Sequence, residues 1–151
     1  PSWPGVGQYN DLANPCAIMV YMGAIAQGGK TAVPKLVLKT VNPLGLPSLP
    51  TLTGRTKTLI NADTADTMAD LMAKNVTDTY GASRFPNMDI CAKSGTAEVG
   101  GGNAPHAWFA GFLRNEDAPY AFVVLVENGG SGSDVAGTVA AKVLDALVNG
   151  Y

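Results

Sequence analysis

The 151-residue sequence has very little of the chemistry that holds metals or builds disulfide frameworks. It contains one histidine and two cysteines, and Cys16 and Cys91 stand far apart, outside any Cys-x-x-Cys pattern. One histidine and two distant cysteines do not make a ligand set for a metal, and two cysteines do not make a disulfide framework. The sequence therefore predicts no metal and no other cofactor.

Charge is also sparse, and neither sign dominates. Asp, Glu, Lys and Arg make up 15% of the chain, the formal net charge is −2, and the basic residues form no run. Clustered positive charge is what draws proteins to nucleic acids and anionic membranes, so neither is expected as a partner. The apolar runs are too short for a membrane span, and no signal-peptide pattern is visible. With 46% hydrophobic residues, residues 1–151 are predicted to pack as a single domain.

Two segments carry helix signals at both ends. Asn14 can cap a helix that begins at the proline after it, and Gly28 suits the left-handed stop. A second helix is expected to start at Asn61 or Asp63 and to end at Gly81. Apolar residues recur at helical spacing in both and are expected to lie in the core: Ile18, Met22 and Ile25 in the first, and Ala65, Met68, Ala69, Met72 and Val76 in the second.

The connection between the two predicted helices looks irregular, and strand signals follow in the second half of the chain. Residues 33–58 are rich in Pro and Gly and predict an irregular connection, with at most a short strand near residues 36–39. Three strands are then predicted over residues 88–98, 107–113 and 120–127. The short turns between them make consecutive strands antiparallel neighbours.

A final helix is expected over residues 135–149, with Ser133 or Asp134 as its cap. The strand at 120–127 is apolar on both faces, which requires cover on both sides of the sheet. The predicted fold class is therefore α/β of the α+β type, an antiparallel sheet of about three strands with helices packed on its faces. The helix residues expected to face the core are Val135, Val139, Val143, Leu144 and Leu147.

The stretch Lys93-Ser94-Gly95-Thr96 lies in the first predicted strand and carries the most chemistry. Side chains alternate along a strand, so Lys93 and Gly95 point to one face and Ser94 and Thr96 to the other. A lysine charge beside two hydroxyls suits a carboxylate, and N–H groups at the strand edge suit a developing oxyanion. Taken alone, the tetrapeptide is weak evidence of a site, and a surface lysine beside a bulge is the favoured interpretation. Glu98 either lines the rim of such a site or stands in solvent.

Other conspicuous residues have simpler interpretations. Sheet packing is expected for Trp108, Phe109 and Phe112, and Cys91 is expected to be a small packed residue. His106 is the only histidine, and a general base is conceivable because its pKa is normally near neutrality. A structural role at the start of the aromatic strand is the favoured interpretation.

In combination, these segments resemble a known family. KSGTAE, the glycine-rich turn after it, HAWFAGF, YAFVVLVEN, a glycine-rich loop and the final helix resemble, in this order, the C-terminal half of penicillin-binding transpeptidases. The opening GVGQ and NPCAIMVYMGAIAQGGK also resemble that family, so the resemblance runs from about Gly5 to the end. It implies the C-terminal portion of a β-lactamase/transpeptidase-like fold.

The resemblance implies roles for the four motif residues. Lys93 would keep the pocket positive and bond to a hydroxyl of the family's second motif. Ser94 would bind the carboxylate of a peptidoglycan stem peptide or of a β-lactam. Gly95 would let the substrate lie alongside the strand as an added strand. Thr96 would lend its N–H to the oxyanion hole, so Lys93 and Thr96 are the implied catalytic residues, and Ser94, Gly95 and Thr96 the implied substrate-binding residues.

The motif that carries the family's nucleophile is missing. No serine in the sequence is followed by lysine three residues later, and Ser-x-Asn does not occur. The resemblance therefore implies that the acylated serine lies upstream of this sequence and that this chain alone is inactive. It also implies that the apolar edge of strand 120–127 is covered by the missing half of the domain, a swapped segment or a second copy.

The parent protein implied by the resemblance is a serine D,D-transpeptidase that cross-links peptidoglycan stem peptides. It would lie in the cell envelope, on the extracytoplasmic face of the cytoplasmic membrane, with an anchor upstream. Two alternatives stay open. The parent could be a β-lactam sensor or β-lactamase-like protein, since the third motif is shared, or the chain could be a module that holds cell-wall peptide without cleaving it.

Overall fold

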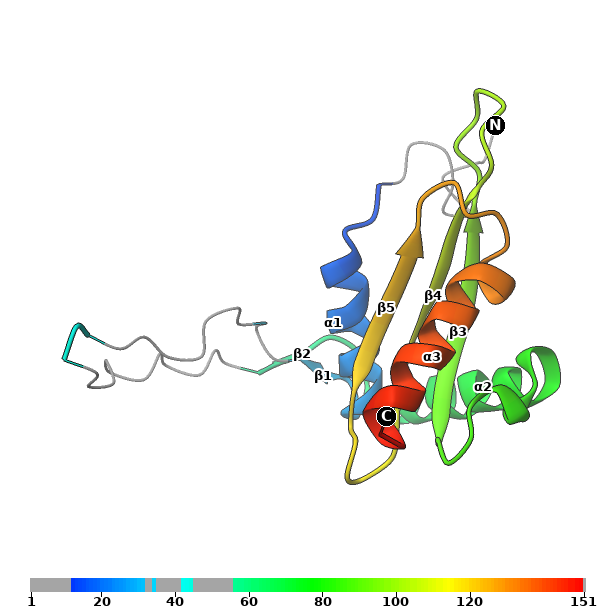
Figure 1. The fold of residues 1–151 in the computed structure, drawn as a ribbon. Coiled ribbons are helices and arrows are strands. Elements are labelled where there is room, and N and C mark those ends of the chain that lie inside the picture. Colours follow the sequence, from blue (N-terminus) through cyan, green and yellow to red (C-terminus); the bar gives the residue numbers. More distant parts are fainter. Residues whose placement is uncertain (1–11, 32–33, 35–41, 45–55, 151) are drawn as a thin grey trace.

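A computed structural model describes residues 12–31, 34, 42–44 and 56–150. Its centre is an antiparallel sheet of three strands in the order β3-β4-β5, with helices on both faces (Figure 1). Strand β3 covers Ile90–Ala97, β4 covers His106–Leu113 and β5 covers Ala121–Val126. The predicted fold class and the three predicted strands are confirmed, with ends that differ by at most two residues.

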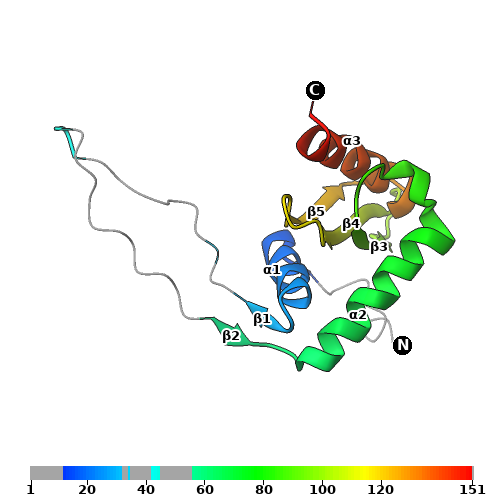
Figure 2. The same ribbon diagram turned by 90° about the horizontal axis from the view of Figure 1, so that it is seen from below.

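The helices divide between the two faces of this sheet. Helix α1 (Pro15–Ala26) and much of helix α2 (Ala62–Asn75) pack on one face, and helix α3 (Gly137–Val148) packs on the other (Figure 2). Strand β5 contacts both α1 and α3, which meets the expectation of cover on both faces. All six residues of β5 are nevertheless only half-buried, because β5 is an edge strand of this sheet. No helix in the described ranges is long and apolar enough to cross a membrane.

Local signals place the ends of the first two helices. The side chain of Asn14 accepts a hydrogen bond from the N–H of Cys16 (2.8 Å), so it caps α1 as predicted, and Gly28 follows that helix with a φ of 61°. Asn61 stands at the cap position of α2 but makes no side-chain cap bond. A π-helical turn, Val76–Tyr80, continues α2, and Gly81 ends it with a φ of 84°.

The core consists of one cluster on each face of the sheet. The α3 face is centred on Phe109, which is fully buried and packs its ring against Tyr80 (5.1 Å between centroids), Phe85 (6.1 Å) and Phe122 (6.2 Å). The α1 face is a smaller cluster in which Met72 of α2 joins residues of α1 and the sheet. Its buried members are Ile25, Ala69, Met72, Cys91 and Phe112.

The final helix differs from its prediction in two ways. It begins with a π-helical turn, Gly132–Ala136, before α3, and its cap is Ser131, whose Oγ accepts from the N–H of Asp134 (3.3 Å). Its buried face is also narrower than predicted, because the helix turns one line of residues to the sheet while the apolar stripe beside it faces away. Ala136, Ala140 and Leu144 are buried, whereas Val139, Val143 and Leu147 are 42%, 53% and 53% exposed.

The long connection between α1 and α2 begins and ends in a short ladder that the sequence does not predict. Strand β1 (Lys30–Thr31) pairs antiparallel with β2 (Lys57–Thr58). The strand predicted near residues 36–39 lies outside the described residues. Met68 is a further difference on α2: it is 36% exposed, while the other predicted apolar residues of that helix are buried.

Candidate functional site

Strand β3 presents its motif residues to the two faces in the predicted alternation. Lys93 and Gly95 lie on the α1 face with Cys91, opposite Ala110 and Trp108 of β4 in the antiparallel register. Ser94 and Thr96 lie on the α3 side, where each bonds to a group outside the sheet. Lys93 and Thr96 are exposed, and Ser94 and Gly95 are half-buried.

A cavity of about 560 Å³ lies between α1 and the sheet, and the motif forms one of its walls. Lys93 is the only lysine or arginine among the described residues that line it, while Glu98 and Glu127 bring negative charge to its rim. Ile18 lines the cavity and is half-buried, which corrects the expectation that it lies in the core. Met22 and Trp108 also line the cavity, and Met22 packs against the α1-face cluster while remaining half-buried. Its full lining is Leu12, Ala13, Ile18, Met22, residues 93–99, His106, Trp108, Ala110, Leu125 and Glu127.

The end of α2 supplies hydrogen-bond partners to the outer edge of β3, the edge that faces away from β4. The Tyr80 hydroxyl donates to Ser94 Oγ (2.9 Å) and accepts from the N–H of Ser94 (2.7 Å). Asn75 Nδ2 donates to the carbonyl of Ala92 (3.2 Å) on the same edge. Because N–H groups alternate in direction along a strand, the N–H of Thr96 points to this edge as well.

Positive charge lies next to the Ser94 backbone. Lys93 Nζ donates to the carbonyl oxygen of Ser94 (2.7 Å), so the ammonium group lies over the outer edge of β3, although the Lys93 side chain leaves the strand on the α1 face. The Lys93 ammonium and the Ser94 hydroxyl therefore lie on either side of one point at the outer edge of β3, where a ligand group could bind. A carboxylate placed there would meet a charged donor and a neutral donor together.

The glycine-rich loop before α3 lies directly on the motif. The N–H of Gly132 donates to Thr96 Oγ1 (3.2 Å). A Cβ at residue 132 would stand 2.2 Å from the carbonyl oxygen of Gly95 and 2.7 Å from that of Trp108, so only glycine allows this approach. The loop thus holds the Thr96 side chain on the α3 side of the strand.

His106 has the structural role that the sequence favours. Its Nδ1 accepts a hydrogen bond from the N–H of Asn128 (2.9 Å), which assigns the ring proton of the neutral imidazole to Nε2. Asn128 follows β5 and has a φ of 52°. The bond therefore joins the start of β4 to the turn after β5 at the rim of the cavity.

Cys91 is a packed residue, as predicted, and burial makes its thiol unreactive. Its side chain is fully buried, and burial raises the pKa of the thiol to about 11. The thiolate, which is the nucleophilic form, is therefore scarce near neutral pH. The described residues also contain no group of three or more His, Cys, Asp or Glu side chains that could hold a metal ion.

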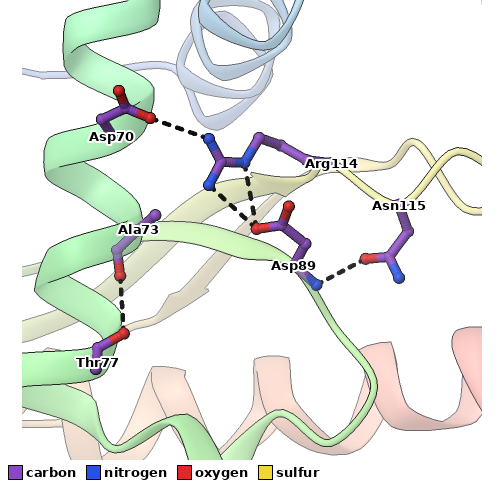
Figure 3. Close-up of polar contacts among 6 residues, drawn as sticks. All are labelled: Asp70, Ala73, Thr77, Asp89, Arg114 and Asn115. Carbon is purple, nitrogen blue, oxygen red and sulfur yellow. Dashed lines mark hydrogen bonds and ion pairs between the residues drawn. The ribbon is translucent and has the colours of Figure 1, made fainter.

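An ion-pair cluster ties α2 to the segments just before β3 and just after β4 (Figure 3). Arg114, which follows β4, pairs with Asp89 ahead of β3 (3.2 Å) and with Asp70 of α2 (3.2 Å). Asn115 accepts from the N–H of Asp89 (2.9 Å), and in the π-helical turn after α2 Thr77 Oγ1 donates to the carbonyl of Ala73 (3.4 Å). These contacts join α2 to the start of β3 and so set where Asn75 and Tyr80 reach the strand edge.

Sequence reasoning missed Tyr80, Asn75 and Gly132. Tyr80 lies 14 residues before Ser94 and belongs to a segment predicted only as the end of a helix. Nothing local distinguishes a tyrosine that bonds to a strand from one that packs in a core. The GG-S-G-S pattern around Gly132 signals a loop, but not the strand on which the loop lies.

Comparison with known proteins gives a consistent result. The family model of the penicillin binding protein transpeptidase domain matches residues 4–145. Peptidoglycan D,D-transpeptidase PbpA of Mycolicibacterium smegmatis is 32% identical over 145 residues, which are 91% of this chain and 29% of that protein.

Solved structures agree with this match. The imipenem acyl-enzyme complex of penicillin-binding protein A from M. tuberculosis matches with a TM-score of 0.83 at 28% identity, covering 97% of this chain and 33% of that chain. The penicillin G acyl-enzyme complex of the same protein matches with a TM-score of 0.77 at 29% identity, covering 96% and 34%. This chain therefore spans about a third of the length of these relatives.

Proposed function

Because this chain belongs to the penicillin-binding protein transpeptidase family, we propose that residues 1–151 form, as one domain fragment, a wall of a D,D-transpeptidase active site. The observation that carries the proposal is the position of the Lys93 ammonium and the Ser94 hydroxyl on the outer edge of β3, beside the cavity. The reaction is the cross-linking of peptidoglycan stem peptides.

The ligand group at this wall is the carboxylate of a D-alanyl-D-alanine end, or the corresponding carboxylate of a β-lactam. Lys93 supplies the positive charge and Ser94 a hydroxyl donor, and charge-assisted bonds of this kind are stronger than neutral ones. Gly95 leaves space beside the strand, since it has no side chain. The acyl-enzyme complexes of penicillin-binding protein A with imipenem and penicillin G support β-lactams as ligands of this fold.

The nucleophile is a serine outside this sequence, because no serine here has a lysine three residues later. That serine attacks the carbonyl of the penultimate D-alanine, the terminal D-alanine leaves, and the acyl group passes to the amine of another stem peptide. Lys93 stabilises the carboxylate carried by the departing D-alanine, which leaves through its amine nitrogen, and the N–H of Thr96 points toward the developing oxyanion. The chain acts in the cell envelope, outside the cytoplasmic membrane, where this substrate is found.

The first test is the intact mass of the 151-residue chain after incubation with excess benzylpenicillin, beside a sample without the drug. An unchanged mass is expected, because the acylated serine lies elsewhere. A stoichiometric adduct that survives denaturation would show that a residue of this chain is acylated, and peptide mapping would identify it. The assignment of the nucleophile to another part of the protein would then be wrong.

The second test restores the rest of the domain. The matching segment of M. smegmatis PbpA is replaced by this chain, and acylation of the hybrid by a fluorescent penicillin is measured. We expect acylation, and a loss of about 10²-fold in its rate for Lys93→Met. Lys142→Met is the matched control, because Lys142 is exposed on α3, across the sheet from the cavity. A folded hybrid that is not acylated, or equal rates for both variants, would refute the proposed role of this wall.

A further inference from the structure

Tyr80 is a buried residue whose hydroxyl has no part in the proposed reaction. Its side chain is 7% exposed, and its ring packs edge-on against Phe109 (5.1 Å between centroids, 66° between planes). Val76, at the other end of the same π-helical turn, is 3% exposed. Packing therefore holds both the ring of Tyr80 and the backbone turn that carries it, and the phenol oxygen has a fixed position beside Ser94.

The hydrogen bonds at this point determine where the Ser94 proton can go. A serine hydroxyl has one proton and two acceptor positions. Tyr80 donates its own proton to Ser94 Oγ, while the phenol oxygen is taken by the N–H of Ser94. Among the described residues, Ser94 Oγ has no other hydrogen-bond partner, so its proton is available to an acceptor that arrives from outside.

We propose that Tyr80 is a positioning residue for the carboxylate site: its phenol fixes the Ser94 hydroxyl so that the serine proton points to the incoming carboxylate. The inference rests on the proposed function, since it assigns Tyr80 to the same ligand group. Tyr80 does not touch the carboxylate in this arrangement. It acts through Ser94, which would otherwise rotate among staggered positions and lose part of its donor geometry.

The surroundings of the phenol agree with this role. Burial alone would raise the pKa of Tyr80, but hydrogen bonding with the hydroxyl and N–H of Ser94 and with Asn75, together with the charge of Lys93, outweighs it, and the pKa is lowered. Lys93 lies over the carbonyl of Ser94, so the carboxylate position has the ammonium on one side and the oriented hydroxyl on the other.

Tyr80 and Asn75 also limit where a peptide can pair with β3. The N–H of Ser94 bonds to the phenol, and the carbonyl of Ala92 bonds to Asn75. A substrate strand therefore cannot form ladder bonds at these two groups without displacing a partner. The end of the ligand that bears the carboxylate is directed to the position that Ser94 and Lys93 flank.

A measurement without ligand tests the contact itself in the full 151-residue chain. In Tyr80→Phe, which removes only the hydroxyl, the amide proton of Ser94 should move upfield in the NMR spectrum because it loses its acceptor. In Ser94→Ala, the pKa of the Tyr80 phenol, followed by ¹³Cζ NMR, should rise from its lowered value. Tyr120→Phe is the matched control, since Tyr120 is 43% exposed and lies in the turn before β5. Unmoved Ser94 and Tyr80 signals would overturn the proposal.

A binding measurement tests the role. The probe is N-acetyl-D-alanyl-D-alanine, titrated into wild type, Tyr80→Phe, Ser94→Ala and the double variant, and followed by the Gly95 amide signal. Tyr80→Phe should raise Kd about fivefold, the loss of one neutral hydrogen bond. The double variant should bind like Ser94→Ala, because Tyr80 acts only through that hydroxyl.

The outcomes separate this inference from the proposed function. Wild type that does not bind the probe would overturn the proposed carboxylate site, and the role of Tyr80 with it. Wild type that binds, with an unchanged Kd in Tyr80→Phe, would overturn only the positioning role. Fully additive losses in the double variant would show that Tyr80 acts on the ligand by a route other than Ser94.

Discussion

Replacing Gly132 by alanine is the sharpest test of how the site is held together. The new Cβ would lie 2.2 Å from the carbonyl oxygen of Gly95, 2.7 Å from that of Trp108 and 2.9 Å from the carbonyl carbon of Gly95. All three are backbone atoms of β3 and β4, so no side chain can rotate away. The start of the final helical segment must therefore move off the sheet by about 1 Å to reach ordinary contact distances.

The cost follows from this displacement. Overpacking a close contact costs about 1–3 kcal/mol, and a contact between backbones belongs in the upper half of that range. The hydrogen bond from the N–H of Gly132 to Thr96 Oγ1 is lost as well, at about 1 kcal/mol. The higher helix propensity of alanine relative to glycine offsets up to about 1 kcal/mol of these two costs. We expect Gly132→Ala to lower the free energy of unfolding by about 2–3 kcal/mol.

The assay is equilibrium unfolding in urea, followed by far-ultraviolet circular dichroism and tryptophan fluorescence. Gly23→Ala is the control for the same substitution, because a Cβ at residue 23 of α1 would meet Ala121 Cβ at an ordinary 3.6 Å. It should stabilise the chain by about 0.5–1 kcal/mol through helix propensity. A Gly132→Ala protein within about 0.5 kcal/mol of wild type would refute the close approach of this loop to the sheet.

Three further predictions concern the core and the ion pairs. Phe109→Ala should cost about 3–5 kcal/mol in urea unfolding, since the ring is fully buried among three others; a loss below about 1 kcal/mol would contradict this packing. Because burial raises the pKa of Cys91 from 9.0 to about 11, the unfolded state loses the thiol proton first, and stability falls as pH rises through that window. The fall should be about 2–3 kcal/mol relative to Cys91→Ala, and parallel pH profiles would disprove it. Arg114→Met should cost less than about 1 kcal/mol, because its partners Asp70 and Asp89 are largely exposed; a loss above about 2 kcal/mol would assign Arg114 a larger role.

The prediction that succeeded best was the one with a local cause. Asn14 caps α1 because its side chain reaches an N–H two residues later, and Gly28 follows because it tolerates a positive φ. The alternation of Lys93 and Ser94 follows from strand geometry alone. Such signals act within a few residues, and the sequence displays them directly.

The predicted core face of α3 was only partly right, because the helix is apolar around much of its circumference: Leu144 is buried as predicted, but three other predicted residues are exposed. Val139, Val143 and Leu147 form a stripe that is as hydrophobic and as regularly spaced as the stripe that packs on the sheet, so hydrophobic spacing could not choose between the two. The choice depends on distance to the sheet, where Gly132, with its minimal side chain, comes within contact of the β3 backbone. The face that packs holds Ala136, Ala140 and Leu144, and a hydrophobicity pattern gives the two alanines little weight.

By itself the sequence determined the three strands, the first two helices, the motif from Lys93 to Thr96 and, through the order of its segments, the family. These features depend on neighbouring residues or on a motif that can be read directly. Only the tertiary structure decided that Tyr80 holds Ser94, that Gly132 lies on Gly95, and that the apolar side chains of α1 line a cavity. Those contacts join residues 14 or more positions apart, and their formation depends on how helices and strands pack in space.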